Sequence, residues 1–167
     1  MRRYLLVCCV FALALFSCDG DSGKSLVFTA DAAPSGPALT LTEAQISSEY
    51  LTLTVTGQEL TDCYGVAARI TYDPEVLRYE FFMPASGWSS GVVHASRGAE
   101  GTLVLGITEQ GDTQGNDFSA APLGSIRFTI LKKGDASISF QSAKTAVVDS
   151  TGERVPLSLA GGTLRYK

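Results

Sequence analysis

Few of the side chains that perform chemistry occur in this sequence. It contains a single histidine, His94, and a single tryptophan, and three of its four cysteines lie within the first 18 residues. Cys63 is the one cysteine in the body of the chain, so an intramolecular disulfide and a cysteine-based metal site are excluded there. We expect Cys63 to be a small buried core residue. No stretch has the apolar spacing of a helix.

The N-terminus has the pattern of a bacterial export signal. Two arginines precede an unbroken apolar run over residues 4–16, which is too short to span a bilayer as a stable helix. The run ends at Leu15-Phe16-Ser17-Cys18, which resembles a lipobox. We therefore predict a signal peptide over residues 1–17 and acylation of Cys18, which would anchor the chain to the inner or outer membrane of the cell envelope. The alternative is an ordinary cleaved signal in which Cys18 is incidental.

The charge balance narrows the classes of partner. Removing the signal leaves 150 of the 167 residues, enough for one domain with a hydrophobic core, and 11 of the 13 basic residues against all 17 acidic ones. The resulting net charge of −6 argues against nucleic acid or an anionic lipid surface as a partner. Membrane attachment is expected through the lipid alone.

Alternation with a period of two dominates the chain after Pro37. Apolar and polar residues alternate over 51–56, 66–72, 103–107, 126–130 and 138–141, as in strands with one side in a core and the other in water. Residues 18–37 read as a lipidated cysteine with a flexible tether, in which 25–30 could form a first strand. The domain is expected to occupy residues 38–167.

Turn signals separate these strands at short intervals. Among them, Asp73-Pro74 fits a type I turn, because the Asp73 carboxylate can accept a backbone N–H of the turn and proline presets φ near −65°. After the turn a new strand begins, in which Leu77, Tyr79 and Phe81 are expected to point into the core. Short strands punctuated in this way indicate an all-β, antiparallel sandwich or barrel.

Four segments in this order resemble the cohesin family and related carbohydrate-binding sandwiches: "LTLTVTGQEL" at 51–60, "YGVAARITYDPEVLRYEFF" at 64–82, "PLGSIRFTILKKGDASISF" at 122–140 and "DSTGERVPLSLAGGTLRY" at 149–166. The resemblance covers most of residues 38–167. It implies an antiparallel β-sandwich with jelly-roll topology and about nine strands. Cohesins are non-catalytic modules that hold dockerin modules through one flat sheet face, so the resemblance implies a protein partner, dockerin-like or an envelope component, and no cofactor.

The order and spacing of the possible catalytic residues argue against an enzyme. Residues 87–91, "GWSSG", match the Gly-x-Ser-x-Gly pattern of a hydrolase, but that pattern requires a helix after the serine and a later acid and histidine in reach. No helical pattern follows Ser89, and no acid lies between it and His94. We therefore predict that the chain is not an enzyme.

Two further kinds of ligand remain as weaker hypotheses. The loop "EQGDTQGND" at 109–117 offers Asp112 and Asp117 as hard oxygen ligands, but its spacing is not that of an EF-hand and a solvated loop is favoured. A polysaccharide would need exposed rings. Trp88 lies in a Gly/Ser-rich loop. In the alternating strand, Phe82 falls on the side opposite to the inward residues Leu77, Tyr79 and Phe81, so it is expected to point outward. These two rings are therefore the candidates.

For a protein partner, the candidate surface is a polar sheet face. It would carry Thr52, Thr54, Thr56, Arg69 and Thr71, although such a row also fits any solvated sheet. The sequence thus predicts a lipid-anchored, extracytoplasmic binding module for a protein, with polysaccharide recognition as the alternative.

Overall fold

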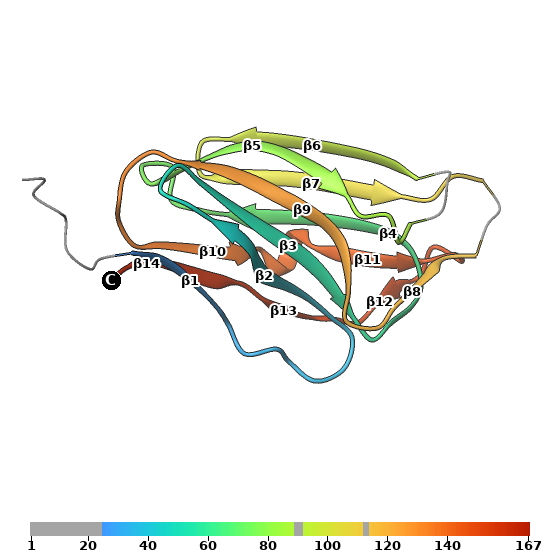
Figure 1. Ribbon diagram of the computed structural model, residues 1–167. Helices are drawn as coiled ribbons and strands as arrows, with labels where there is room; N and C mark the ends of the chain where they lie inside the picture. The colour runs from blue at the N-terminus through green and yellow to red at the C-terminus, as the bar shows by residue number, and fades with distance from the viewer. Residues whose placement is uncertain (1–24, 89–91, 112–113) are drawn as a thin grey trace, which may run out of the picture.

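The computed structural model describes residues 25–88, 92–111 and 114–167, and it folds them into two packed β-sheets (Figure 1). The larger sheet has nine strands and the smaller sheet has five. The larger sheet contains β1 (Leu26–Ala30), β4 (Leu60–Thr71), β6 (Val93–Ala99), β7 (Thr102–Thr108), β8 (Asn116–Phe118), β10 (Ala136–Phe140), β11 (Ala146–Asp149), β12 (Arg154–Val155) and β14 (Gly162–Tyr166). A short 3₁₀ turn, η1 (Ser142–Lys144), joins β10 to β11.

The smaller sheet contains β13 (Ser158–Ala160), β2 (Ala38–Ile46), β3 (Tyr50–Gln58), β9 (Ala121–Ile130) and β5 (Leu77–Pro84), in that order. The β13–β2 pair is parallel and the other neighbours are antiparallel. Within the described ranges, no helix has the length and apolar character needed to cross a bilayer. The predicted all-β sandwich is confirmed, with the C-terminal segment divided into more short strands than expected.

The core is built from the inward residues of both sheets. In β3, Leu51, Leu53 and Val55 are buried while the threonines between them are partly exposed, as the alternation predicted. These residues belong to one cluster with Ile70 and Leu105 of the larger sheet. Burial of apolar surface at about 25 cal/mol per Å² is the main favourable term in such a core.

The Asp73 corner carries the chain from one sheet to the other. Asp73 Oδ1 accepts the Glu75 N–H at 2.9 Å, and the Asp73 carbonyl accepts the N–H groups of Val76 and Leu77. Pro74 occupies the turn position that needs no donor. Since β4 lies in the larger sheet and β5 in the smaller, the predicted corner is also the crossing between the two layers.

A bulge in β5 reverses the predicted parity of its aromatic residues. The register with β9 shifts between Tyr79 and Phe81, so that Phe81 is 44% exposed and Phe82 is 5% exposed. A bulge inserts one residue into a strand and turns the following side chains to the opposite side. The prediction that Phe82 points outward is therefore wrong, and Phe81 takes the outward position.

The sandwich begins earlier than the sequence indicated. β1 pairs with β14 from Leu26↔Tyr166 to Ala30↔Gly162, and Phe28 is buried in the core. The possible strand at 25–30 is confirmed, but the domain boundary at residue 38 is wrong, because the first strand lies inside the segment expected to be a tether. Cys18 and the rest of residues 1–24 lie outside the described ranges.

The inward turn of Phe82 depends on Gly124. A Cβ added at Gly124 would lie closer to the Phe82 ring than real Cβ atoms approach other atoms. We expect Gly124→Ala to lower the free energy of unfolding by about 1–3 kcal/mol, because the ring or the strand must shift. Urea denaturation measures the change. Gly134→Ala is the control, since a Cβ there makes an ordinary contact with Val76; equal stability of the two variants would contradict the packing argument.

Candidate functional site

The structure separates the residues predicted to form one binding face. Thr52, Thr54 and Thr56 lie on β3, so they point outward from the smaller sheet. Arg69 and Thr71 lie on β4, so they point outward from the larger sheet, on the other side of the sandwich. The single face proposed from the sequence therefore does not exist, and the two outer faces must be considered separately.

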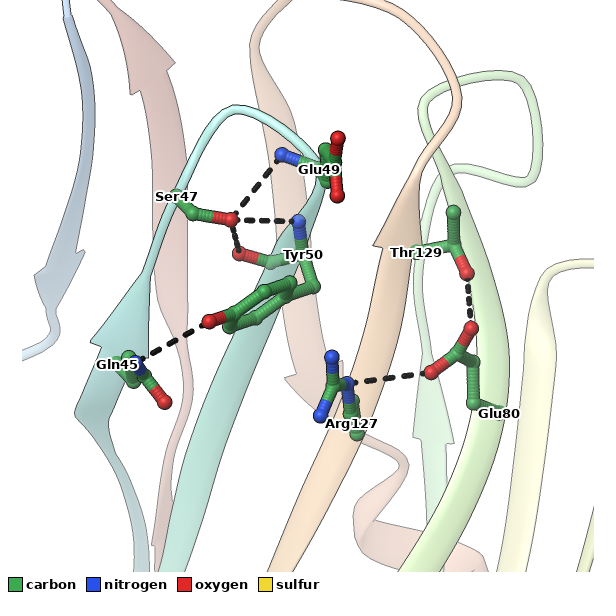
Figure 2. A network of polar contacts seen from close by, with 7 residues as sticks. All are labelled: Gln45, Ser47, Glu49, Tyr50, Glu80, Arg127 and Thr129. Atoms are coloured by element: carbon green, nitrogen blue, oxygen red, sulfur yellow. Dashed lines mark hydrogen bonds and ion pairs between the residues drawn. The ribbon is translucent and has the colours of Figure 1, made fainter.

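At one end of the outer face of the smaller sheet, polar and charged side chains contact one another (Figure 2), while Phe81 and Met83 of β5 are exposed on this sheet. The Arg127 guanidinium lies 4.1 Å from the centroid of the Tyr50 ring and forms an ion pair with Glu80, with 3.2 Å between Nε and Oε2. Thr129 donates to the other Glu80 oxygen at 2.5 Å. The charged groups at this end of the face are thus already paired with one another.

The two rings proposed for sugar stacking are not on the surface. Trp88 is 7% exposed, its indole N–H donates to the Leu123 carbonyl at 2.8 Å, and its ring packs 4.9 Å from Phe118. Phe82 is buried as described above. The expected exposure of both rings is wrong, because Trp88 finds a backbone acceptor that lets the whole indole enter the core.

Of the other residues that the sequence singled out, those within the described ranges form no reactive cluster. Ser89 and Asp112 lie outside the described ranges. His94 is exposed at the sheet edge, with its ring 6.2 Å from that of Phe82. Asp117 accepts the Asp62 N–H, and no group of three or more potential metal ligands occurs in the part of the chain that the structure describes.

Cys63 is buried, as expected. Burial, together with the Asp62 and Glu109 carboxylates, raises the pKa of its thiol to about 12. A thiol with this pKa stays protonated at neutral pH, and the thiolate is the reactive form. Cys63 is therefore a structural residue.

The outer face of the larger sheet carries a row of very small residues. The registers place Ala95 of β6 beside Gly106 of β7, Gly106 beside Ala67 of β4, and Ala67 beside Ala146 of β11. The row therefore crosses four strands and forms the floor of an apolar hollow of about 330 Å³. We name this row and its rim the small-residue face. Small side chains leave the backbone open to close approach by another molecule.

Larger side chains border the row on both sides. On one side Val104, which is 42% exposed, stands between Arg97 and Arg69 in register. On the other side, Thr108 and Val148 flank Gly65. The rim thus combines exposed apolar groups with two cationic side chains, a composition that suits a protein surface with an apolar centre.

A polar hollow of about 740 Å³ adjoins the apolar one and shares Thr108 and Val148 with it. Its walls are the loop after β7 and the turn between β11 and β12. Asp62 ties these segments together, because it accepts the Gly115 N–H at 2.7 Å and the Ser150 hydroxyl at 2.6 Å. These hydrogen bonds lower the pKa of Asp62, and bonds from Thr151 and Glu153 lower that of Asp149.

Sequence reasoning found Arg69 but missed the small residues around it. The one available signal was Ala67, an alanine in an outward position of an alternating strand where polar residues are usual. The row itself depends on cross-strand register, which joins residues 95, 106, 67 and 146 and cannot be read from local pattern.

The lowered pKa of Asp62 makes stability depend on pH. A carboxylate whose folded pKa lies below its unfolded value contributes stability above the unfolded pKa, about 3.9, and loses it as pH falls through the folded pKa. We expect the wild type to be more stable than Asp62→Asn at pH 7 and the gap to shrink towards pH 2 to 3. Thermal melts from pH 7 to 2 measure it. A gap that stays constant with pH would contradict the assignment.

No protein-family model and no curated protein sequence matches the chain. Solved structures do match. The sixth cohesin of scaffoldin B from Acetivibrio cellulolyticus, solved in complex with a dockerin, has a TM-score of 0.66 at 15% identity and covers 80% of this chain and 100% of that one. A type II cohesin domain from the same organism has a TM-score of 0.64 at 16% identity, over 78% and 95%.

A non-cellulosomal cohesin from the archaeon Archaeoglobus fulgidus has a TM-score of 0.59 at 13% identity and covers 75% of this chain and 88% of that one. At these identities the comparisons concern the arrangement of the strands. They confirm the resemblance noted in the sequence: this chain has the cohesin fold.

Proposed function

We propose that this chain is a non-catalytic, cohesin-like binding module that holds a protein partner, dockerin-like or an envelope component, on the small-residue face. The observation that carries the proposal is the outward row of small residues, in which Ala95 and Ala67 are exposed and Gly106 and Ala146 half-buried, with exposed Val104 at its rim. An apolar centre with a polar border is typical of protein interfaces. Cohesins of the same fold are found in complex with dockerins, which supports a protein as the ligand.

The two sheets differ in a way that favours the larger one. The charged residues at one end of the smaller sheet's outer face are paired with one another, whereas a Cβ at Gly106 would meet only the Val66 carbonyl at 3.9 Å. A partner can therefore come close to the backbone of β7. The sugar-binding alternative loses both rings proposed for it, because Trp88 and Phe82 are buried; a glycan would have to stack on another ring, such as Phe81, which is 44% exposed on the smaller sheet.

The second part of the proposal is attachment to the cell envelope. It rests on the sequence, in which the lipobox-like Leu15-Phe16-Ser17-Cys18 follows the apolar run directly. Two or three acyl chains on Cys18 would hold the module stably, since each buried methylene contributes about 0.8 kcal/mol. The module would then present its partner at the surface of a membrane.

The docking face is tested by adding bulk to its floor. We expect Ala67→Arg to weaken retention of the envelope protein held by the full-length chain at least roughly thirtyfold, because a long side chain there blocks close approach. Thr54→Arg, outward on the smaller sheet, is the matched control and should bind as the wild type does. The measurement is quantitative pull-down from envelope extract with both variants checked by circular dichroism.

Two results would count against this site. If Thr54→Arg loses the partner and Ala67→Arg keeps it, the wrong sheet has been assigned. If no protein is retained and the wild type binds insoluble glycan, the polysaccharide alternative is correct.

Anchoring is tested separately at Cys18. We expect the wild type to sediment with membranes and to incorporate labelled fatty acid, and Cys18→Ala to appear in the soluble extracytoplasmic fraction without label. Cell fractionation with immunoblotting measures the distribution. A Cys18→Ala chain that is exported, cleaved and still membrane-bound would rule out the lipid anchor.

A further inference from the structure

The arginines of the two outer faces differ in whether they are already engaged. On the smaller sheet, Arg127 stacks on Tyr50 and pairs with Glu80 (Figure 2). On the larger sheet, neither Arg69 nor Arg97 has a side-chain hydrogen bond or ion pair within residues 25–88, 92–111 and 114–167. Both lie beside exposed Val104 in register, so their guanidinium groups border the small-residue face.

A third arginine borders the same face from the other side. Arg154 of β12 is exposed and lies opposite Val148, which lines the apolar hollow. It likewise has no ion pair in the described part of the chain. Three of the six arginines beyond the signal, Arg69, Arg97 and Arg154, therefore surround one apolar floor.

Two acids at one end of the larger sheet, Asp62 and Asp149, are engaged in hydrogen bonds of their own. The Asp62 carboxylate is held by Gly115 and Ser150, and the Asp149 carboxylate by Thr151 and Glu153. Both acids belong to the turns at one end of the sheet, where backbone N–H groups and hydroxyls satisfy them. The apolar hollow is thus bordered by cations that the protein itself leaves available.

From this arrangement we propose that the partner presents an acidic surface around an apolar ridge. This inference rests on the proposed function and adds the chemistry of the partner. A guanidinium offers a planar set of donors that matches a carboxylate in a bidentate pair. Opposite charge at a rim speeds association and excludes partners of the wrong sign.

The spacing of the strands specifies where the acidic and apolar residues of the partner should lie. Arg97 and Arg69 are separated by two strand spacings, about 10 Å, with Val104 on the strand between them. Residues i and i+7 of a helix are also about 10 Å apart and share one side. A helix lying along the row of small residues would therefore carry acids at i and i+7, with apolar residues at i+3 and i+4 over Gly106 of β7, the strand between the two arginines.

The proposal is tested with two designed three-helix bundles of defined sequence. Both expose one helix with apolar residues at i+3 and i+4; one bundle has Glu at i and i+7 and the other has Lys there. We expect the full-length chain, purified in detergent micelles, to bind the Glu bundle about tenfold more tightly than the Lys bundle at low salt, and the preference to fall in 0.5 M salt. Biolayer interferometry measures both affinities.

Charge reversal on the module supplies the control. The double variant Arg69→Glu/Arg97→Glu should reverse the preference, while Arg78→Glu, an exposed arginine on the smaller sheet, should leave it unchanged. A Glu bundle that binds no better than the Lys bundle, or that fails to bind, overturns the acidic-partner inference.

Binding of the two bundles to Ala67→Arg tests the docking face independently of its charge preference. If Ala67→Arg abolishes binding of both bundles while neither charge is preferred, the face still docks a protein and only its charge specificity is wrong. If Ala67→Arg leaves the binding of both bundles unchanged, the bundles bind elsewhere and the inference fails together with the assignment of the face.

Discussion

Burial of one side of every long strand is the constraint on which the rest of this structure depends. The inward residues of β3 and β9, such as Leu53 and Phe128, have no exposed surface, and they pack in one cluster with Ile70 and Leu105 of the larger sheet. Because side chains alternate along a strand, fixing the inner set also fixes which residues face water. The outer faces are left out of the core, so their chemistry can differ without altering the fold.

That freedom explains why the two faces are so unlike. On the smaller sheet, the bulge after Tyr79 and the alternation of β9 bring Glu80 within reach of Arg127, and Tyr50 supplies a ring beneath the guanidinium. On the larger sheet, pairing of four strands brings alanines and a glycine into line. The smaller sheet also exposes apolar side chains, Phe81 and Met83 of β5, but the charged groups at the Arg127 end of its outer face are paired with one another. Exposed apolar surface on either sheet releases water on binding. What sets the larger sheet apart is its row of small residues, and docking is proposed on this face.

The sequence predicted what depends on local pattern and missed what depends on register. Period-two alternation was enough to predict the sandwich. Asp73-Pro74 was enough to predict the corner, because the chemistry of a turn is local. Phe82 was misplaced because a single inserted residue reverses parity and leaves no trace in composition. Trp88 was misplaced because its burial depends on a carbonyl 35 residues away, that of Leu123. Ala67 and Ala146 become neighbours only through the pairing of β4 with β11.

The net charge of the chain and the charge of the small-residue face point to different partners. The chain is acidic overall, with 17 acidic and 13 basic residues, which favours basic partners at long range, but at about 0.15 M salt charges are screened beyond roughly 8 Å. What a bound surface meets is the local set of side chains. Here backbone N–H groups in the turns hold Asp62 and Asp149, while Arg69, Arg97 and Arg154 border the apolar floor without an ion pair to any described residue. A chain that is acidic overall can therefore present basic side chains on the face proposed for docking, and there local contacts outweigh net charge in selecting a partner.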